Sequence, residues 1–148
     1  MDAETHSGPE AAEPDASSMS AAFEGLRRRL GGNPTLATAR GISGDALDSM
    51  YAVARELCQN GHHAESLVNF QLLCLYDHES ARNWRGLAVC RQALKDYAGA
   101  AAALAVALDR LDGQDAGLEI NLAECLIASG ELDTAEIVIA RLAASADD

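Results

Sequence analysis

Apolar residues recur at intervals of three and four along most of this chain, and this spacing places them on one face of a helix. Short polar or glycine-containing junctions interrupt the pattern at regular distances. Ala and Leu dominate the apolar residues, and aromatic residues make up only 4% of the chain, a composition that favours helices over strands. The pattern therefore predicts an all-α protein with helices at about 45–59, 63–76, 81–94, 97–111, 116–129 and 131–144.

The junctions and the helices that follow them repeat. Gly61, Lys95 and Gly130 occupy corresponding places in three similar junctions, separated by 34 and then 35 residues. This period is the length of a tetratricopeptide repeat, in which each unit is a pair of helices. The sequence thus predicts three tandem tetratricopeptide repeats, stacked as a helix-turn-helix superhelix, with a short N-terminal helix before them.

Aligned positions support this register, because a helix pair needs small residues where its helices touch and larger ones where it meets its neighbour. Trp84, Leu87 and Ala88 match the W-x2-L-G pattern of the repeat, with Ala in place of Gly. Phe70 is expected to pack where the first and second repeats meet. The aligned columns are Ala54, Ala88 and Ala123; Val53, Leu87 and Leu122; Ser66, Ala100 and Ala135; and Phe70, Leu104 and Ile139.

The chain divides into three regions. Residues 1–18 are rich in acidic residues, Ser, Pro and Ala without a hydrophobic period, which predicts a disordered acidic tail. Residues 19–44 read as a short N-terminal helix followed by a linker from Thr35 to Gly44. Residues 45–148 form the predicted repeat domain. Its repeats span about 47–80, 81–115 and 116–148.

Stacked helix pairs form a concave face lined by the first helix of each repeat, and such a groove suits an extended or helical peptide. Helix phase predicts that the groove has apolar side chains, a dip at Gly86 and basic side chains at its rim. For Tyr51 and Val89 the alternative is a core position, and for the arginines it is a solvated surface. The predicted partner-binding residues are Tyr51, Ala52, Arg55, Cys58, Gln59, Arg82, Arg85, Gly86, Val89, Gln92, Ala93, Ile120 and Asn121.

Composition and motifs exclude several function classes. A formal net charge of −12 repels phosphates and anionic lipids, so neither nucleic acid nor a membrane surface is an expected partner. The four cysteines lack CxxC spacing, and the scattered Cys and His residues do not form a metal-binding motif. No phosphate-binding loop or hydrolase motif is present, so we expect no cofactor, no metal and no catalysis. An acidic start without a secretory signal indicates the cytoplasm.

Several blocks between about residues 40 and 142 carry a more specific resemblance, because they have the order and spacing of one family. The chain resembles the class II chaperones of bacterial type III secretion, the LcrH/SycD-like chaperones of pore-forming translocators. The blocks are 41–43 with 47–54, Asn69–Cys74 with Asp77 and His78, Gly86–Ala93, and Ala123–Leu126 with Gly130–Leu132.

This resemblance implies a protein of the Gram-negative bacterial cytoplasm that binds translocator proteins before export and keeps them soluble, without a cofactor. Family members commonly have further aromatic residues where this chain has Arg55, Cys58 and His63, which implies a less aromatic pocket here. The alternative is a generic tetratricopeptide scaffold or co-chaperone in a regulatory protein complex.

One helix lacks a polar face. The predicted helix from Tyr97 has no charged residue through Leu108, and a helix that is apolar all round is normally buried. The positions expected to point outward are Gly99, Ala102, Ala103 and Val106. We expect this face to be covered by Phe23, Leu26 and Leu30 of the N-terminal helix or by a second subunit in a homodimer. The alternative is an exposed alanine-rich helix.

Overall fold

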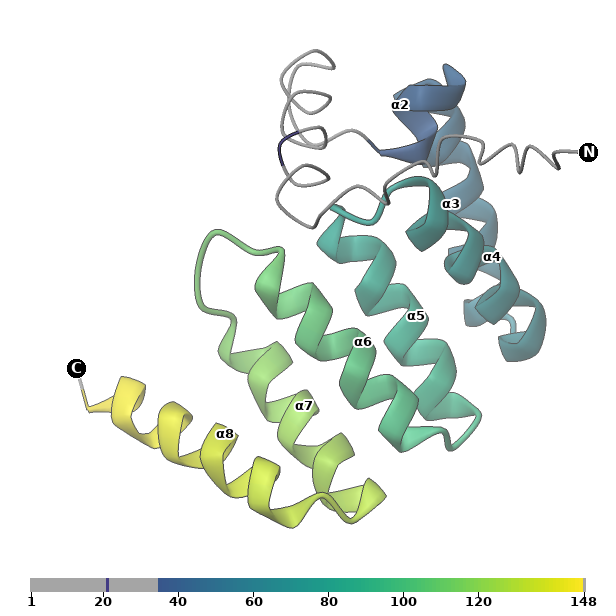
Figure 1. Cartoon of the computed structure of the whole chain (residues 1–148). Coiled ribbons are helices and arrows are strands. Elements are labelled where there is room, and N and C mark those ends of the chain that lie inside the picture. Colours follow the sequence, from purple (N-terminus) through teal and green to yellow (C-terminus); the bar gives the residue numbers. More distant parts are fainter. Residues whose placement is uncertain (1–20, 22–34, 148) are drawn as a thin grey trace, which may run out of the picture. The chain divides into compact units, whose positions relative to one another are not determined.

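The computed structural model describes residue 21 and residues 35–147 of the chain, and its second compact unit is Thr35–Asp148. Within residues 35–147 the secondary structure is entirely helical, which confirms the all-α prediction (Figure 1). The helices are α2 (Leu36–Arg40), α3 (Gly44–Gln59), α4 (His63–Tyr76), α5 (Ala81–Ala93), α6 (Tyr97–Asp109), α7 (Ala116–Ser129) and α8 (Leu132–Ala146). The predicted acidic tail and, apart from residue 21, the predicted N-terminal helix lie outside the described residues.

The prediction of a linker from Thr35 to Gly44 is wrong for the segment that forms α2. The Thr35 hydroxyl accepts a hydrogen bond from the backbone N–H of Thr38 at 3.2 Å, which caps the start of this short helix. Gly41 ends it in a left-handed conformation with φ of 68°. These two capping residues therefore define a helix of five residues. The helix is too short for a hydrophobic period to reveal it.

The three junctions that set the repeat period have the same backbone conformation. Gly61, Lys95 and Gly130 have φ angles of 81°, 62° and 88°. The residue after each one donates its N–H to a carbonyl five positions earlier, at 2.9, 2.8 and 2.8 Å. This is the Schellman arrangement that ends a helix, and glycine favours it because it lacks a Cβ atom. The shared geometry confirms the register of the three repeats, with Lys95 adopting the glycine conformation.

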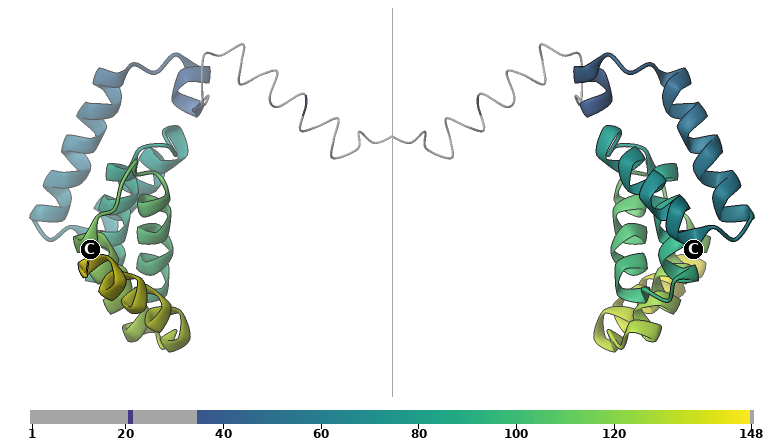
Figure 2. Two further views of the ribbon diagram at one scale, coloured as in Figure 1. Left: turned by 90° about the vertical axis from the view of Figure 1, so that its left-hand side faces the viewer. Right: turned by 90° about the vertical axis from the view of Figure 1, so that its right-hand side faces the viewer.

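Consecutive helices from α3 to α8 pack side by side as three pairs, and α3 also contacts α5. The views in Figure 2 place α2 and the α7–α8 pair at opposite ends of this unit. The small residues predicted at the contacts between helices are buried: Ala54, Ala88, Ala123, Ser66, Ala100 and Ala135. Ser66 stands where the other two repeats have alanine. Its buried hydroxyl is not left unsatisfied, because it donates a hydrogen bond to the Ala54 carbonyl oxygen at 2.6 Å.

In the aligned columns of larger residues, the residues of the middle repeat are buried, whereas some at the ends of the array are exposed. Leu87 and Leu104 are almost fully buried, whereas their counterparts Val53 and Ile139 are 52% and 46% exposed. A repeat buries these positions against its neighbour. Among the described residues no helix pair precedes α3 or follows α8. Val53 and Ile139, at the two ends of the described array, therefore lack the neighbour that buries the corresponding residues in the middle repeat.

The predicted outward face of α6 needs one correction. Ala103 is only 1% exposed and belongs to the core, on the same side of the helix as Ala100 and Ala107. Ala102 is exposed, and Gly99 and Val106 are partly exposed. Phe23, Leu26 and Leu30 lie outside the described residues, so the covering of this face stays a prediction.

We expect Phe70→Ala to lower the free energy of unfolding by about 3–5 kcal/mol, because Phe70 is 2% exposed and its loss leaves a cavity between the first two repeats. Urea denaturation followed by circular dichroism measures this change. Val68→Ala on the same helix is the control, since Val68 is 61% exposed and should change stability by less than about 0.5 kcal/mol. A loss below about 1 kcal/mol for Phe70→Ala would contradict the assigned packing.

Candidate functional site

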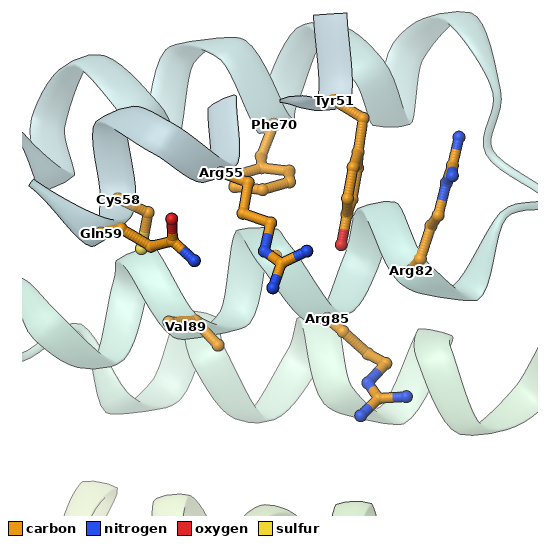
Figure 3. A pocket seen from close by; sticks show the side chains of 9 residues that line it. Tyr51, Arg55, Cys58, Gln59, Phe70, Arg82, Arg85 and Val89 are labelled. Carbon is orange, nitrogen blue, oxygen red and sulfur yellow. The ribbon is translucent and has the colours of Figure 1, made fainter. Parts of the chain in front are cut away.

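A pocket of about 490 Å³ lies between the first helices of the first two repeats (Figure 3). Eight of its nine lining residues belong to the set predicted from the sequence, and the ninth is Phe70. The lining residues are Tyr51, Arg55, Cys58 and Gln59 from α3, Phe70 from α4, and Arg82, Arg85, Gly86 and Val89 from α5. The structure therefore brings together most of the predicted residues of the first two repeats.

An aromatic pair forms one wall of the pocket. The rings of Tyr51 and Phe70 meet edge to face, with their centroids 5.7 Å apart and an angle of 77° between their planes. The guanidinium of Arg82 lies 4.5 Å from the centroid of the Tyr51 ring. Arg82 also forms an ion pair with Asp48 of α3. Tyr51 is thus held between a cation and a second ring, which fixes the face that it presents.

Gly86 is not an open dip that awaits a ligand, and this part of the prediction is wrong. A Cβ atom at position 86 would lie 2.1 Å from Cε1 and 2.4 Å from Cζ of Phe70. The missing side chain therefore makes room for the Phe70 ring. Sequence reasoning placed Phe70 only in the core, although it also lines the pocket. A glycine opposite the large residue of the preceding helix is the signal that could have revealed this contact.

Five predicted residues do not line this pocket: Ala52, Gln92, Ala93, Ile120 and Asn121. Gln92 of α5 and Asn121 of α7 bind each other instead. The Gln92 amide donates to Asn121 Oδ1 at 2.7 Å, and the Asn121 amide donates to Gln92 Oε1 at 3.2 Å. This reciprocal pair joins the second and third repeats. Ile120 is 51% exposed on α7, so the predicted contact with a partner stays open for it.

Cys58 differs from the other three cysteines. Burial raises the pKa of the Cys74 thiol to about 12 and that of the Cys90 thiol to about 11, and it raises the pKa of Cys125 as well. Cys58 is partly exposed and lines the pocket. Its sulfur lies 3.9 Å from Nδ1 of His63. Among residues 21 and 35–147, no group of three or more metal-ligating side chains comes together.

The lining therefore combines apolar area with guanidinium groups, which suits the recognition of a polypeptide side chain.

Within the described part of the chain, no helix has the length and apolar run that crossing a bilayer requires. Three successive helix pairs with a pocket between their first helices define a tetratricopeptide-repeat protein. The tetratricopeptide-repeat family profile matches residues 91–148.

Comparison with individual proteins defines the family more closely. The chain is 35% identical over 107 residues to the Low calcium response locus protein H of Yersinia pestis, covering 72% of this chain and 63% of that relative's length. It is 32% identical to the type III secretion translocator chaperone SycD of Yersinia enterocolitica, with a TM-score of 0.65 and coverage of 75% and 82% of the two chains.

A third comparison involves a bound complex. The chain is 33% identical to PcrH of Pseudomonas aeruginosa in complex with the chaperone binding region of PopB, with a TM-score of 0.62 and coverage of 71% and 86%. Because the chain is more than 30% identical to these chaperones over most of their structures, it belongs to the family of type III secretion translocator chaperones. This is the same family that the sequence blocks resemble.

We expect Gly86→Ala to lower the free energy of unfolding by about 1–3 kcal/mol, because the added methyl group overlaps the buried Phe70 ring. The sign is diagnostic, since glycine to alanine in an open helical position stabilises by up to about 1 kcal/mol. Gly44→Ala is the control, as no atom lies within 4 Å of a Cβ there. Stability in urea equal to or above the parent for Gly86→Ala would contradict the assigned contact.

Proposed function

We propose that this protein is a cytoplasmic chaperone of type III secretion that binds a segment of a pore-forming translocator protein before export. In this role it keeps the translocator soluble and competent for secretion. The bound segment lies along the concave side of the repeats, and the pocket between α3 and α5 receives one of its side chains. The role involves no catalytic step.

The pocket is the observation that carries this proposal. It has an apolar wall made by Tyr51 and Phe70, together with Val89, which is 47% exposed on α5. Burying a leucine-sized side chain in such a site contributes about 1.5–3 kcal/mol to binding. Translocators carry membrane-active segments, and covering apolar side chains of this kind opposes their aggregation.

Relatives support the choice of ligand. Solved structures of PcrH contain the chaperone binding regions of PopB and PopD, and one structure of SycD contains a peptide of the translocator YopD. By analogy, a translocator segment is the expected occupant here. The general scaffold function shares the repeats but gives no reason for the family match. One solved structure of SycD is described as an alternative dimer, so a homodimer is included in the proposal.

We expect Tyr51→Ala to weaken the binding of the cognate translocator by about 1–3 kcal/mol, which corresponds to roughly fivefold to 150-fold in Kd. Co-expression and pull-down with candidate translocators identify the ligand, and isothermal titration calorimetry measures the Kd. Tyr97→Ala is the matched control, because Tyr97 lies on α6 and does not line the pocket. Unchanged affinity for a folded Tyr51→Ala variant would place the binding site elsewhere.

A further inference from the structure

The basic side chains of the described residues are unevenly paired. Of the eight arginine and lysine side chains, four form ion pairs with acidic side chains: Arg82 with Asp48, Arg91 with Asp96, Arg110 with Glu79, and Arg141 with Glu119. The other four form no ion pair with any residue that the structure describes. These are Arg40, Arg55, Arg85 and Lys95. Two of the four, Arg55 and Arg85, line the pocket.

These two arginines come from different helices and belong to the same cavity. Figure 3 shows the Arg55 side chain extending from α3 toward α5, between Tyr51 and Val89. Arg85 extends from α5, one residue before the contact between Gly86 and the Phe70 ring. Both side chains are exposed. A ligand that enters the pocket therefore meets two guanidinium groups beside an apolar wall.

The charge of the pocket is opposite to that of the whole chain. The chain has a formal net charge of −12. The residues that line the pocket nevertheless include three arginines and no aspartate or glutamate. Asp48 already neutralises Arg82. Arg55 and Arg85 have no acidic partner among the described residues, so both positive charges remain available to an anionic ligand in this pocket.

Guanidinium groups also set the geometry of the ligand. An arginine binds a carboxylate through two parallel N–H···O bonds, which a lysine ammonium cannot reproduce. The adjacent wall of Tyr51, Phe70 and Val89 has no charge and suits an aliphatic side chain. A ligand that satisfies both parts carries a carboxylate close to an apolar side chain.

We infer that this pocket selects a polypeptide segment in which an acidic residue neighbours an apolar anchor, and that Arg55 and Arg85 determine this specificity. The inference rests on the proposed function, since it names the chemistry of the segment that the same pocket receives. The apolar anchor supplies contact area, and the two arginines discriminate between an acidic neighbour and a neutral or basic one.

Three short synthetic peptides with the same apolar framework and with Glu, Gln or Lys at the positions flanking a central Leu test this inference. Fluorescence anisotropy of labelled peptides measures the Kd at low and high salt. We expect the Glu peptide to bind about tenfold more tightly than the Gln peptide at low salt, with the Lys peptide weakest. The ratio should shrink toward one at high salt, because these charges are exposed to solvent.

The double variant Arg55→Gln/Arg85→Gln should lose this preference, so that its Glu and Gln peptides bind within about twofold of each other while the Gln peptide keeps its parental affinity. The matched control is Arg40→Gln/Lys95→Gln, which removes the same charge outside the pocket and should keep the tenfold ratio. The charge-reversed variant Arg55→Glu/Arg85→Glu should favour the Lys peptide.

Equal affinity for the three peptides in the parent protein would overturn the inference and leave the proposed function standing. The same would follow if the Glu preference persisted in Arg55→Gln/Arg85→Gln. If none of the peptides bound and the translocator also failed to bind in the pull-down, the proposed function itself would fall, and the inference with it.

Discussion

The contact between the Phe70 ring and the backbone at Gly86 is the constraint on which the pocket depends. Three helices meet there, because Phe70 comes from α4, Gly86 from α5, and Tyr51 of α3 packs edge-on against the same ring. The ring lies where any side chain at position 86 would be. Because glycine has no side chain, the first and second repeats come close enough for the Phe70 ring to be part of both the core and the pocket wall.

The repeat architecture explains why this wall occurs between the first two repeats. In an array, each repeat buries its larger residues only against a neighbour, and the exposure of Val53 and Ile139 shows the consequence at both ends of the described array. At the interface between the first two repeats both neighbours are present, and Phe70 and Leu87 are buried there. A rigid wall at this place preorganises the site, which lowers the entropic cost of binding a flexible segment.

The periodicity of small and large residues was sufficient to predict the helices α3 to α8, the register of the repeats and eight of the nine residues around the pocket. These features depend on local backbone geometry and helix phase, both of which recur every 34 or 35 residues. The Schellman junctions at Gly61, Lys95 and Gly130 are the clearest case, because one backbone conformation repeats with the same hydrogen bonds.

The features that the sequence did not predict depend on contacts between specific side chains. Nothing in the period of the repeat shows that Phe70 fills the space at Gly86, or that Gln92 and Asn121 satisfy each other's amide groups across two repeats. Ala103 is a similar case, because on an alanine-rich helix the buried and exposed faces have the same composition. Helix α2 depends on its two capping residues.

Methyl NMR spectroscopy of valine-labelled protein tests most directly the claim that the segment binds on the concave side, at the pocket. The five valines report separate places: Val53 on α3, Val68 on the exposed side of α4, Val89 in the pocket, Val106 on α6 and Val138 on the buried side of α8. On addition of the translocator segment, the Val89 methyl signals should shift most, with Val68 and Val106 unchanged. Large shifts at Val68 or Val106 without a change at Val89 would contradict the account.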